Sequence, residues 1–174
     1  GRSSAEWERK TGESSVVVRA GDAEYLLTQP VSEQSAAARY LRRHPDGVSE
    51  LIFEVDDADK AFSVLEERGA AMVCDVREAE GEGGSMRWFS ITTAYGDTVF
   101  TFVEREGYAP LKPGIVMHAE PIGGANRFKF GHIDHVTSNF LTLKPLVAWC
   151  KQVLGLEEYW GIEFHTKEYS TIDG

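Results

Sequence analysis

The stretch SELIFEV (residues 49–55), followed by DDADKAFSVLEER (56–68) and Gly69, decides the fold. Its first seven residues are mostly apolar or β-branched, which favours a strand. Asp56 or Asp57 can cap a following helix, and Gly69 stands where helices commonly end. The apolar positions of this helix recur at helical spacing, at Ala61, Phe62 and Leu65. We therefore predict a strand, then a helix over residues 58–68.

Three further strands are expected after this helix, over residues 71–76, 86–93 and 98–104. An acidic, glycine-rich turn over residues 78–85 separates the first two, and Tyr95-Gly96-Asp97 joins the last two as a hairpin. The order is therefore β-α-β-β-β.

Upstream, residues 15–20 and 23–28 predict two strands joined at Gly21-Asp22. A helix over residues 33–43 is expected to follow, with Ser32 as its cap, whereas residues 1–14 are polar and predicted to be loop. The chain has no initiator Met, and we expect it to be a fragment or a trimmed chain.

The pattern restarts after residues 105–127, which are rich in Gly and Pro and predict a linker. We expect a strand over residues 128–137, a helix ending near Leu154 before Gly155, and strands over 157–164 and 166–172. This indicates an α+β fold of repeated β-α-β-β-β modules, incomplete at both ends. The alternative is an ordinary α+β domain whose spacing is coincidental.

Composition excludes some function classes. The 174 residues carry a net charge of −10, from 28 acidic and 18 basic residues, which argues against nucleic acid as a partner. The nearest basic cluster, Arg39, Arg42, Arg43 and His44, lies where a helix is expected to end, and cations there complement the helix dipole. No apolar run is long enough to predict a membrane span. Cys74 and Cys150 are far apart in apolar runs, which indicates free thiols and a cytoplasmic protein.

The segment GHIDHVTSN (residues 131–139) places two histidines and an aspartate within five residues. If it is a strand, His135 lies on one face, and His132 and Asp134 lie on the other. An imidazole on a rigid strand can bind a metal, although a hydrogen-bonded structural histidine is the commoner case.

Several stretches, in order along the chain, resemble the 4-hydroxyphenylpyruvate dioxygenase family. The most specific is YGDTVFTFVER (residues 95–105), which is similar to the end of that family's amino-terminal domain. The segments EVDD (54–57), ERGA (67–70), LKPG (111–114) and IDHV (133–136) also resemble the family's sequence. The resemblance covers nearly the whole chain.

This resemblance implies paired β-α-β-β-β modules of the vicinal-oxygen-chelate type, as in glyoxalase and bleomycin-resistance proteins. Residues 1–104 would be the late part of module one and a complete module two, 105–127 a linker, and 128–174 the start of an iron-binding catalytic domain. The family binds Fe(2+) through two histidines and a glutamate. His135 matches the first ligand and His132 does not. The other two ligands would lie beyond residue 174, so the chain alone is expected to be inactive.

The resemblance further implies that 4-hydroxyphenylpyruvate and O2 are the substrates and homogentisate the product, in tyrosine catabolism. Strand edges left open in such a fragment favour a homo-oligomer. Two alternatives stay open: an enzyme similar to hydroxymandelate synthase, and a metal-free, non-catalytic binding module of the same fold.

Overall fold

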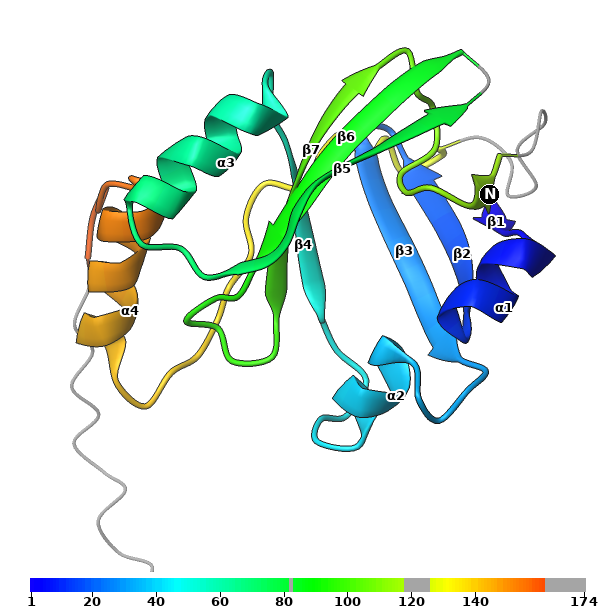
Figure 1. Cartoon of the computed structure of the whole chain (residues 1–174). Helices are drawn as coiled ribbons and strands as arrows, with labels where there is room; N and C mark the ends of the chain where they lie inside the picture. The colour runs from blue at the N-terminus through cyan, green and yellow to red at the C-terminus, as the bar shows by residue number, and fades with distance from the viewer. Residues whose placement is uncertain (82, 118–125, 162–174) are drawn as a thin grey trace, which may run out of the picture.

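The computed structural model describes residues 1–81, 83–117 and 126–161, and it contains two four-stranded sheets (Figure 1). The first sheet has the order β3-β2-β1-β8 and the second β4-β7-β6-β5. The elements are β1 (Arg2–Ser3), α1 (Ala5–Thr11), β2 (Glu13–Ala20), β3 (Ala23–Pro30), α2 (Ala36–Leu41), β4 (Glu50–Glu54), α3 (Ala58–Glu67), β5 (Met72–Gly81), β6 (Gly84–Ile91), β7 (Val99–Glu106), β8 (Ile115–Val116), α4 (Leu143–Trp149) and a π-helical turn (Cys150–Leu154).

The second sheet contains the predicted β-α-β-β-β unit, which is confirmed. Its first strand, β4, pairs in parallel with its last strand, β7, while β5, β6 and β7 pair antiparallel. The predicted turn over residues 78–85 is wrong in extent, because β5 and β6 stay paired as far as Gly81 and Gly84. Exposed acids are compatible with an antiparallel ladder, so the hairpin closes later than its composition suggests.

Helix α3 begins and ends at the predicted signals. The Asp57 side chain accepts a hydrogen bond from the Lys60 backbone N–H at 2.9 Å, and Gly69 follows the helix with a φ of 88°. Ala58 and Leu65 face the sheet and are buried. The ring of Phe62 meets Phe89 edge-on, with centroids 5.2 Å apart. The cap and the apolar face together fix this helix on the second sheet.

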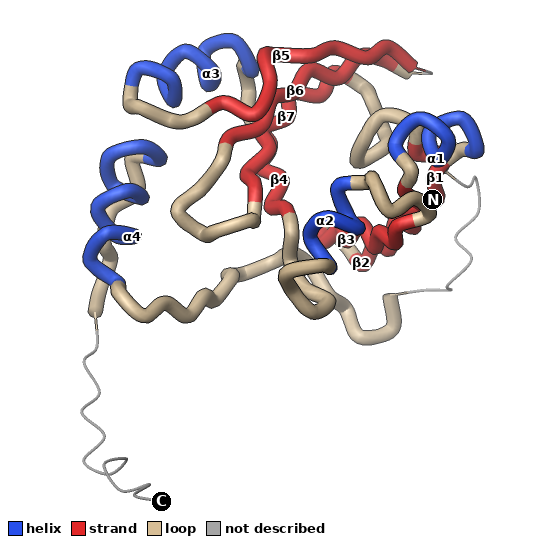
Figure 2. Tube along the Cα trace, turned by 60° about the horizontal axis from the view of Figure 1, so that its bottom comes forward, coloured by secondary structure: helices blue, strands red, loops and turns tan. Residues whose placement is uncertain are grey.

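Strands β6 and β7 are buried on both faces. Toward α3 they present Phe89, Ile91 and Phe100, which form one cluster with Leu65 and Val153. Toward the other face they present Met86 and Val103, which pack with Tyr108. Figure 2 shows the second sheet lying between the helices α3 and α4 and the first sheet.

The first sheet contains the predicted hairpin, with Ala20 opposite Ala23 and Gly21 at a φ of 63°. The prediction of loop over residues 1–14 is wrong, because this stretch forms β1 and α1. Ser4 caps α1, and Gly12 ends it at a φ of 70°. The helix predicted over residues 33–43 is shorter than expected. It is α2, which spans Ala36–Leu41 and is capped by Ser35 instead of Ser32.

The stretch predicted as a linker contributes to the core. Within residues 105–117, the side chains of Tyr108, Leu111 and Ile115 are buried, and β8 pairs with β1. The division at residues 104 and 127 stays a prediction, because burial does not by itself divide a chain into domains.

The strand predicted over residues 128–137 is wrong. Residues 126–142 contain no strand or helix and are exposed throughout. The helix predicted to end near Leu154 is confirmed: α4 begins at Leu143 and passes into the π-helical turn, which Gly155 ends at a φ of 69°. Residues 157–161 form no strand, and the rest of the two strands predicted over 157–172 lies outside the described residues.

Helix α4 lies beside α3 on the same face of the second sheet (Figure 1). The Trp149 ring lies 6.2 Å from the rings of both Tyr95 and Phe100. The Tyr95 hydroxyl contacts the Cys150 sulfur at 3.5 Å. Burial, and secondly this hydrogen bond, raises the pKa of Tyr95 to about 12.

This raised pKa predicts a loss of stability at high pH. An unfolded tyrosine loses its proton near pH 10, whereas folded Tyr95 retains it. The contribution is therefore fully present below about pH 10 and is lost as the pH rises toward about 12. Urea unfolding from pH 8 to 12 should show this decline in the parent chain and a smaller one in Tyr95→Phe.

The matched control is Tyr25→Phe, because Tyr25 is 53% exposed on β3. It should be as stable as the parent at pH 8, and phenolate absorbance of Tyr95→Phe should show one late-titrating tyrosine fewer than the parent. Equal alkaline decline in all three proteins would contradict the packing of α4 on Tyr95.

Candidate functional site

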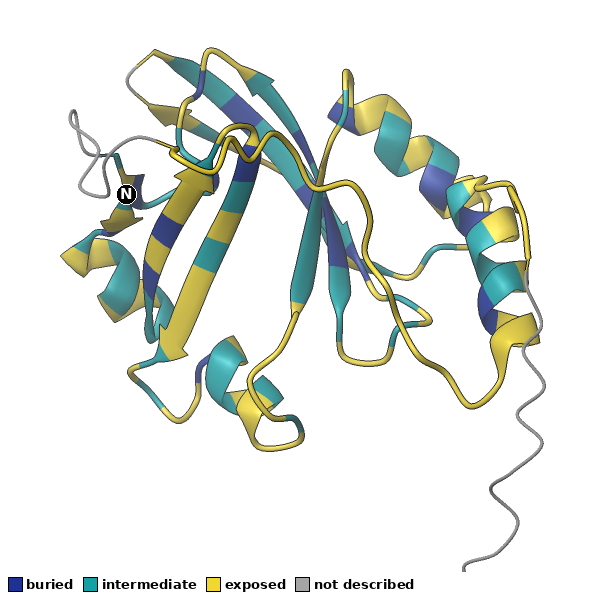
Figure 3. Ribbon diagram, turned by 180° about the vertical axis from the view of Figure 1, so that it is seen from behind, coloured by how far each residue is buried: buried dark blue, intermediate teal, exposed yellow. Residues whose placement is uncertain are grey.

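The segment that carries His135 lies on the outside of the fold. Figure 3 shows residues 126–142 as a long exposed stretch between the first sheet and α4. Its start is held against the β2–β3 turn, because the Asp22 N–H donates to the Gly131 carbonyl at 2.6 Å. The Asn126 side chain hydrogen-bonds both the N–H and the carbonyl of Phe130, at 3.0 and 2.6 Å. The segment is therefore anchored before His135 and exposed at it.

His135 and Asp134 form a pair, which corrects the expectation that they lie on opposite faces. The His135 Nδ1–H donates to Asp134 Oδ2 at 2.7 Å, and the two side chains are 75% and 84% exposed. The expectation failed because it assumed a strand, and the segment is not one. The hydrogen bond from His135, followed by the charges of His135 and His132, holds the pKa of Asp134 below its usual value.

This pairing has a chemical consequence for metal binding. Histidines that bind metals commonly donate their second ring N–H to a carboxylate, which fixes the tautomer and orients the ring. With Nδ1 bound to Asp134, the Nε2 lone pair of His135 is the one available to a metal.

The described residues do not build a complete metal site. Within residues 1–81, 83–117 and 126–161, no three His, Cys, Asp or Glu side chains are grouped so that they could hold a metal ion. A facial iron site needs three protein ligands. His135 could supply one of them, so these residues alone do not fit Fe(2+).

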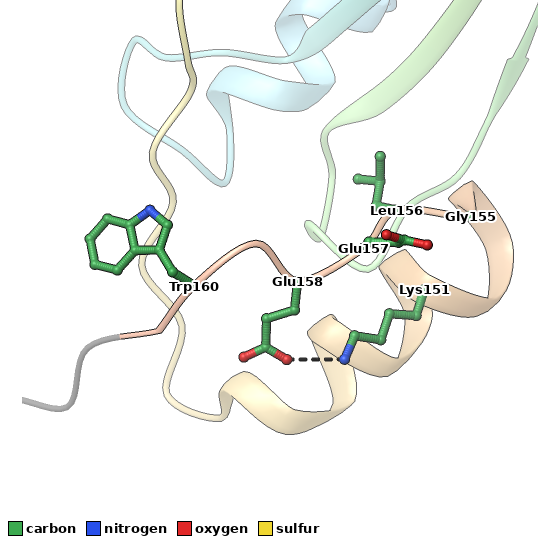
Figure 4. A pocket seen from close by; sticks show the side chains of 6 residues that line it. All are labelled: Lys151, Gly155, Leu156, Glu157, Glu158 and Trp160. Atoms are coloured by element: carbon green, nitrogen blue, oxygen red, sulfur yellow. Dashed lines mark hydrogen bonds and ion pairs between the residues drawn. The ribbon is translucent and has the colours of Figure 1, made fainter.

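Two hollows lie elsewhere on the described surface. Figure 4 shows the larger, about 720 Å³, where the chain leaves the π-helical turn between Lys151 and Trp160. Lys151 and Glu158 form an ion pair of 3.0 Å across it, and His135 does not line it. A smaller hollow of about 330 Å³ lies beside α2. Neither contains a recognisable set of catalytic groups.

The face of the second sheet opposite α3 carries a cluster of hydrogen-bonded polar side chains that sequence reasoning missed. Thr101 is buried, and its hydroxyl contacts Ser90 Oγ at 2.7 Å and Glu50 Oε1 at 2.5 Å. Glu50 also pairs with Lys112. The available signal was polar residues at alternate positions in otherwise apolar strands.

An ion-pair cluster joins the two sheets. Arg105 of β7 lies 3.2 Å from Glu54 of β4 and 3.7 Å from Glu24 of β3. The side chains of Arg105 and Glu24 are only 17% and 13% exposed. These contacts fix the first sheet relative to the second and suit a structural role.

Comparison with curated proteins gives consistent matches. The chain is 30% identical over 176 residues to the 4-hydroxyphenylpyruvate dioxygenase of Coccidioides posadasii (strain C735). This match covers 88% of this chain and 44% of that protein. It is 32% identical over 152 residues to the protein of the same name from Caenorhabditis elegans, with 80% and 37% covered. The chain thus spans less than half the length of these relatives. No protein-family model matches the sequence.

Comparison with solved structures concerns the fold alone. A hypothetical protein from Bacillus halodurans C-125 superposes with a TM-score of 0.51 at 18% identity, covering 63% of this chain and 77% of that one. Methylmalonyl-CoA epimerase of Streptomyces coelicolor gives 0.50 at 18% identity, covering 63% and 78%. The chain therefore has the predicted α+β, vicinal-oxygen-chelate type of fold. In the described part of the chain, no helix has the length and apolar character needed to cross a membrane.

The cluster around Arg105 predicts a loss of stability in Arg105→Met. This change keeps the aliphatic stem but removes the cation that Glu54 and Glu24 share between the two sheets. Among the described residues, Glu24, which is largely buried, then keeps only its ion pair with Arg19 of its own hairpin. We expect the free energy of unfolding at pH 7 to fall by about 1–3 kcal/mol in urea denaturation. Arg9→Met on α1, where the side chain is exposed, should change it little. Equal stability of the Arg105 and Arg9 variants would show that the cluster does not join the sheets.

Proposed function

We infer that this chain, which is similar to 4-hydroxyphenylpyruvate dioxygenases over most of its length, is a portion of an iron-dependent oxygenase of that kind. The whole protein would convert 4-hydroxyphenylpyruvate and O2 to homogentisate by oxidative decarboxylation and ring hydroxylation, in tyrosine catabolism. The observation that carries the proposal is the extent of the match, 30% identity over 88% of the chain.

The location of the most family-like stretch supports this proposal. Residues 95–105 form the β6–β7 turn and most of β7. Strand β7 lies between β4 and β6 and is buried on both faces. A sequence in such a position is constrained by packing on both sides, so similarity there is expected to accompany a shared fold.

We assign a separate role to each part of the chain. Residues 1–104 are a scaffold domain without catalytic residues, 105–127 connect it to the next domain, and 128–174 begin that catalytic domain. His135 is the first iron ligand, held by Asp134 in the tautomer that offers Nε2. The two remaining ligands lie outside this sequence.

This assignment gives the described residues no catalytic step, because they do not fit Fe(2+) without further ligands. The substrate and O2 are therefore partners of the whole protein. We place that protein in the cytoplasm and expect it to form a homo-oligomer.

A metal-free binding module is the second candidate function. It is compatible with the described residues, which supply no three-ligand group, and so is the first candidate. The two candidates differ in whether the complete gene product binds iron through His135.

The test compares His135→Ala with His132→Ala in the complete gene product. The two histidines lie three positions apart in the same exposed segment, so His132→Ala controls for the loss of an imidazole. His135→Ala should lower bound iron and homogentisate formation by more than about 100-fold, since even changes beyond the ligands cost 10- to 100-fold. His132→Ala should leave both unchanged, and the 174-residue chain alone should show no turnover.

Absence of iron from the complete parent protein would favour the metal-free module. Iron binding that survives His135→Ala would refute the ligand assignment and leave the family similarity intact.

A further inference from the structure

The smaller hollow differs in charge from the rest of the molecule. It measures about 330 Å³ and is lined by Ala36, Arg39, Tyr40, Arg42, Arg43 and Asp97. Three of these six residues are arginines, in a chain whose net charge is −10. The hollow lies between α2 and the β6–β7 turn that contains Asp97. A local excess of positive charge in a concave place attracts anions.

The arginine contacts do not match the sequence interpretation of a helix dipole. Arg39 Nη1 donates to the Gln34 carbonyl at 2.6 Å, and Arg42 Nη1 donates to the Glu33 carbonyl at 2.8 Å. Both carbonyls precede α2, whereas a cation that complements a helix dipole binds the carbonyls of the last turn. The helix is also only six residues long.

These two contacts restrain both side chains and use one donor of each. A guanidinium has five N–H donors, so most donors of Arg39 and Arg42 remain for a ligand. Within the described part of the chain, neither arginine forms a salt bridge with a carboxylate. Restrained arginines with unused donors suit carboxylate or phosphate oxygens.

The acid at the edge of the hollow already has partners. Asp97 Oδ2 lies 2.8 Å from His44 Nε2 and 3.5 Å from Arg43 Nη1. The Tyr40 ring packs against the His44 ring, with centroids 4.6 Å apart. Asp97 therefore fixes one wall of the hollow, and the arginines still outnumber it.

We propose that this hollow is a binding site for a small anion that carries a carboxylate or phosphate group. Its volume is at the small end of the range for ligand sites, roughly 300–1,000 Å³, which suits a metabolite-sized anion. The strongly acidic chain disfavours a nucleic acid, which needs an extended basic surface. This inference does not depend on the proposed oxygenase function.

The test is an NMR titration of the ¹⁵N-labelled chain with sodium phosphate or sodium citrate, against sodium chloride at matched ionic strength. Amide shifts should move at residues 36–43 and 95–98, with a Kd of roughly 1 mM or tighter. Tighter binding of phosphate would assign a phosphorylated ligand, and tighter binding of citrate a carboxylate.

The double variant Arg39→Gln/Arg42→Gln should weaken this binding at least ~10-fold. Its matched control, Arg9→Gln/Lys10→Gln, removes the same charge from exposed positions of α1 and should bind as the parent does. Heteronuclear spectra of the free proteins verify that each variant is folded. Shifts no larger than with chloride, or equal weakening in both double variants, would overturn the proposal.

Discussion

The burial of β6 and β7 on both faces is the constraint on which the rest of the structure depends. Phe89 and Phe100 need a helix layer over one face, which α3 and α4 provide. Met86 and Val103 need cover on the other face, which Tyr108 provides. The first sheet reaches the same face through the contact of Arg105 with Glu24. Each layer of the molecule is thus placed by what these two central strands must bury.

A predicted element is found in the structure more readily when the residues that specify it are close together in the sequence. Asp57 and Gly69 are local signals, and α3 begins and ends at them. A strand needs a neighbour, and residues 128–137 have the composition of a strand but no partner among the described residues, so Ile133 and Val136 stay exposed. Helix α1 was missed although Ser4 and Gly12 carry its cap signals, because its apolar content is low. Tertiary contacts, which one sequence does not reveal, decided the case of residues 128–137.

In the candidate site, too, residue types could be read from the sequence but their contacts could not. His135 could be singled out from its motif, but its contact with Asp134 could not, because that contact arises in an irregular segment. The arginines beside α2 were visible as a cluster, yet the carbonyls that hold them precede the helix. A packed β-α-β-β-β scaffold thus carries a candidate iron ligand on an exposed segment outside its sheets.

Hydrogen exchange of the 174-residue chain, resolved by residue, tests this account most directly. The account predicts that amides of β6 and β7 exchange most slowly, near the rate set by global unfolding. Residues 131–137 should exchange nearly as fast as an unstructured peptide, since they lie in no sheet. Protection of residues 131–137 equal to that of β7 would contradict the account, because it would place His135 in a hydrogen-bonded strand.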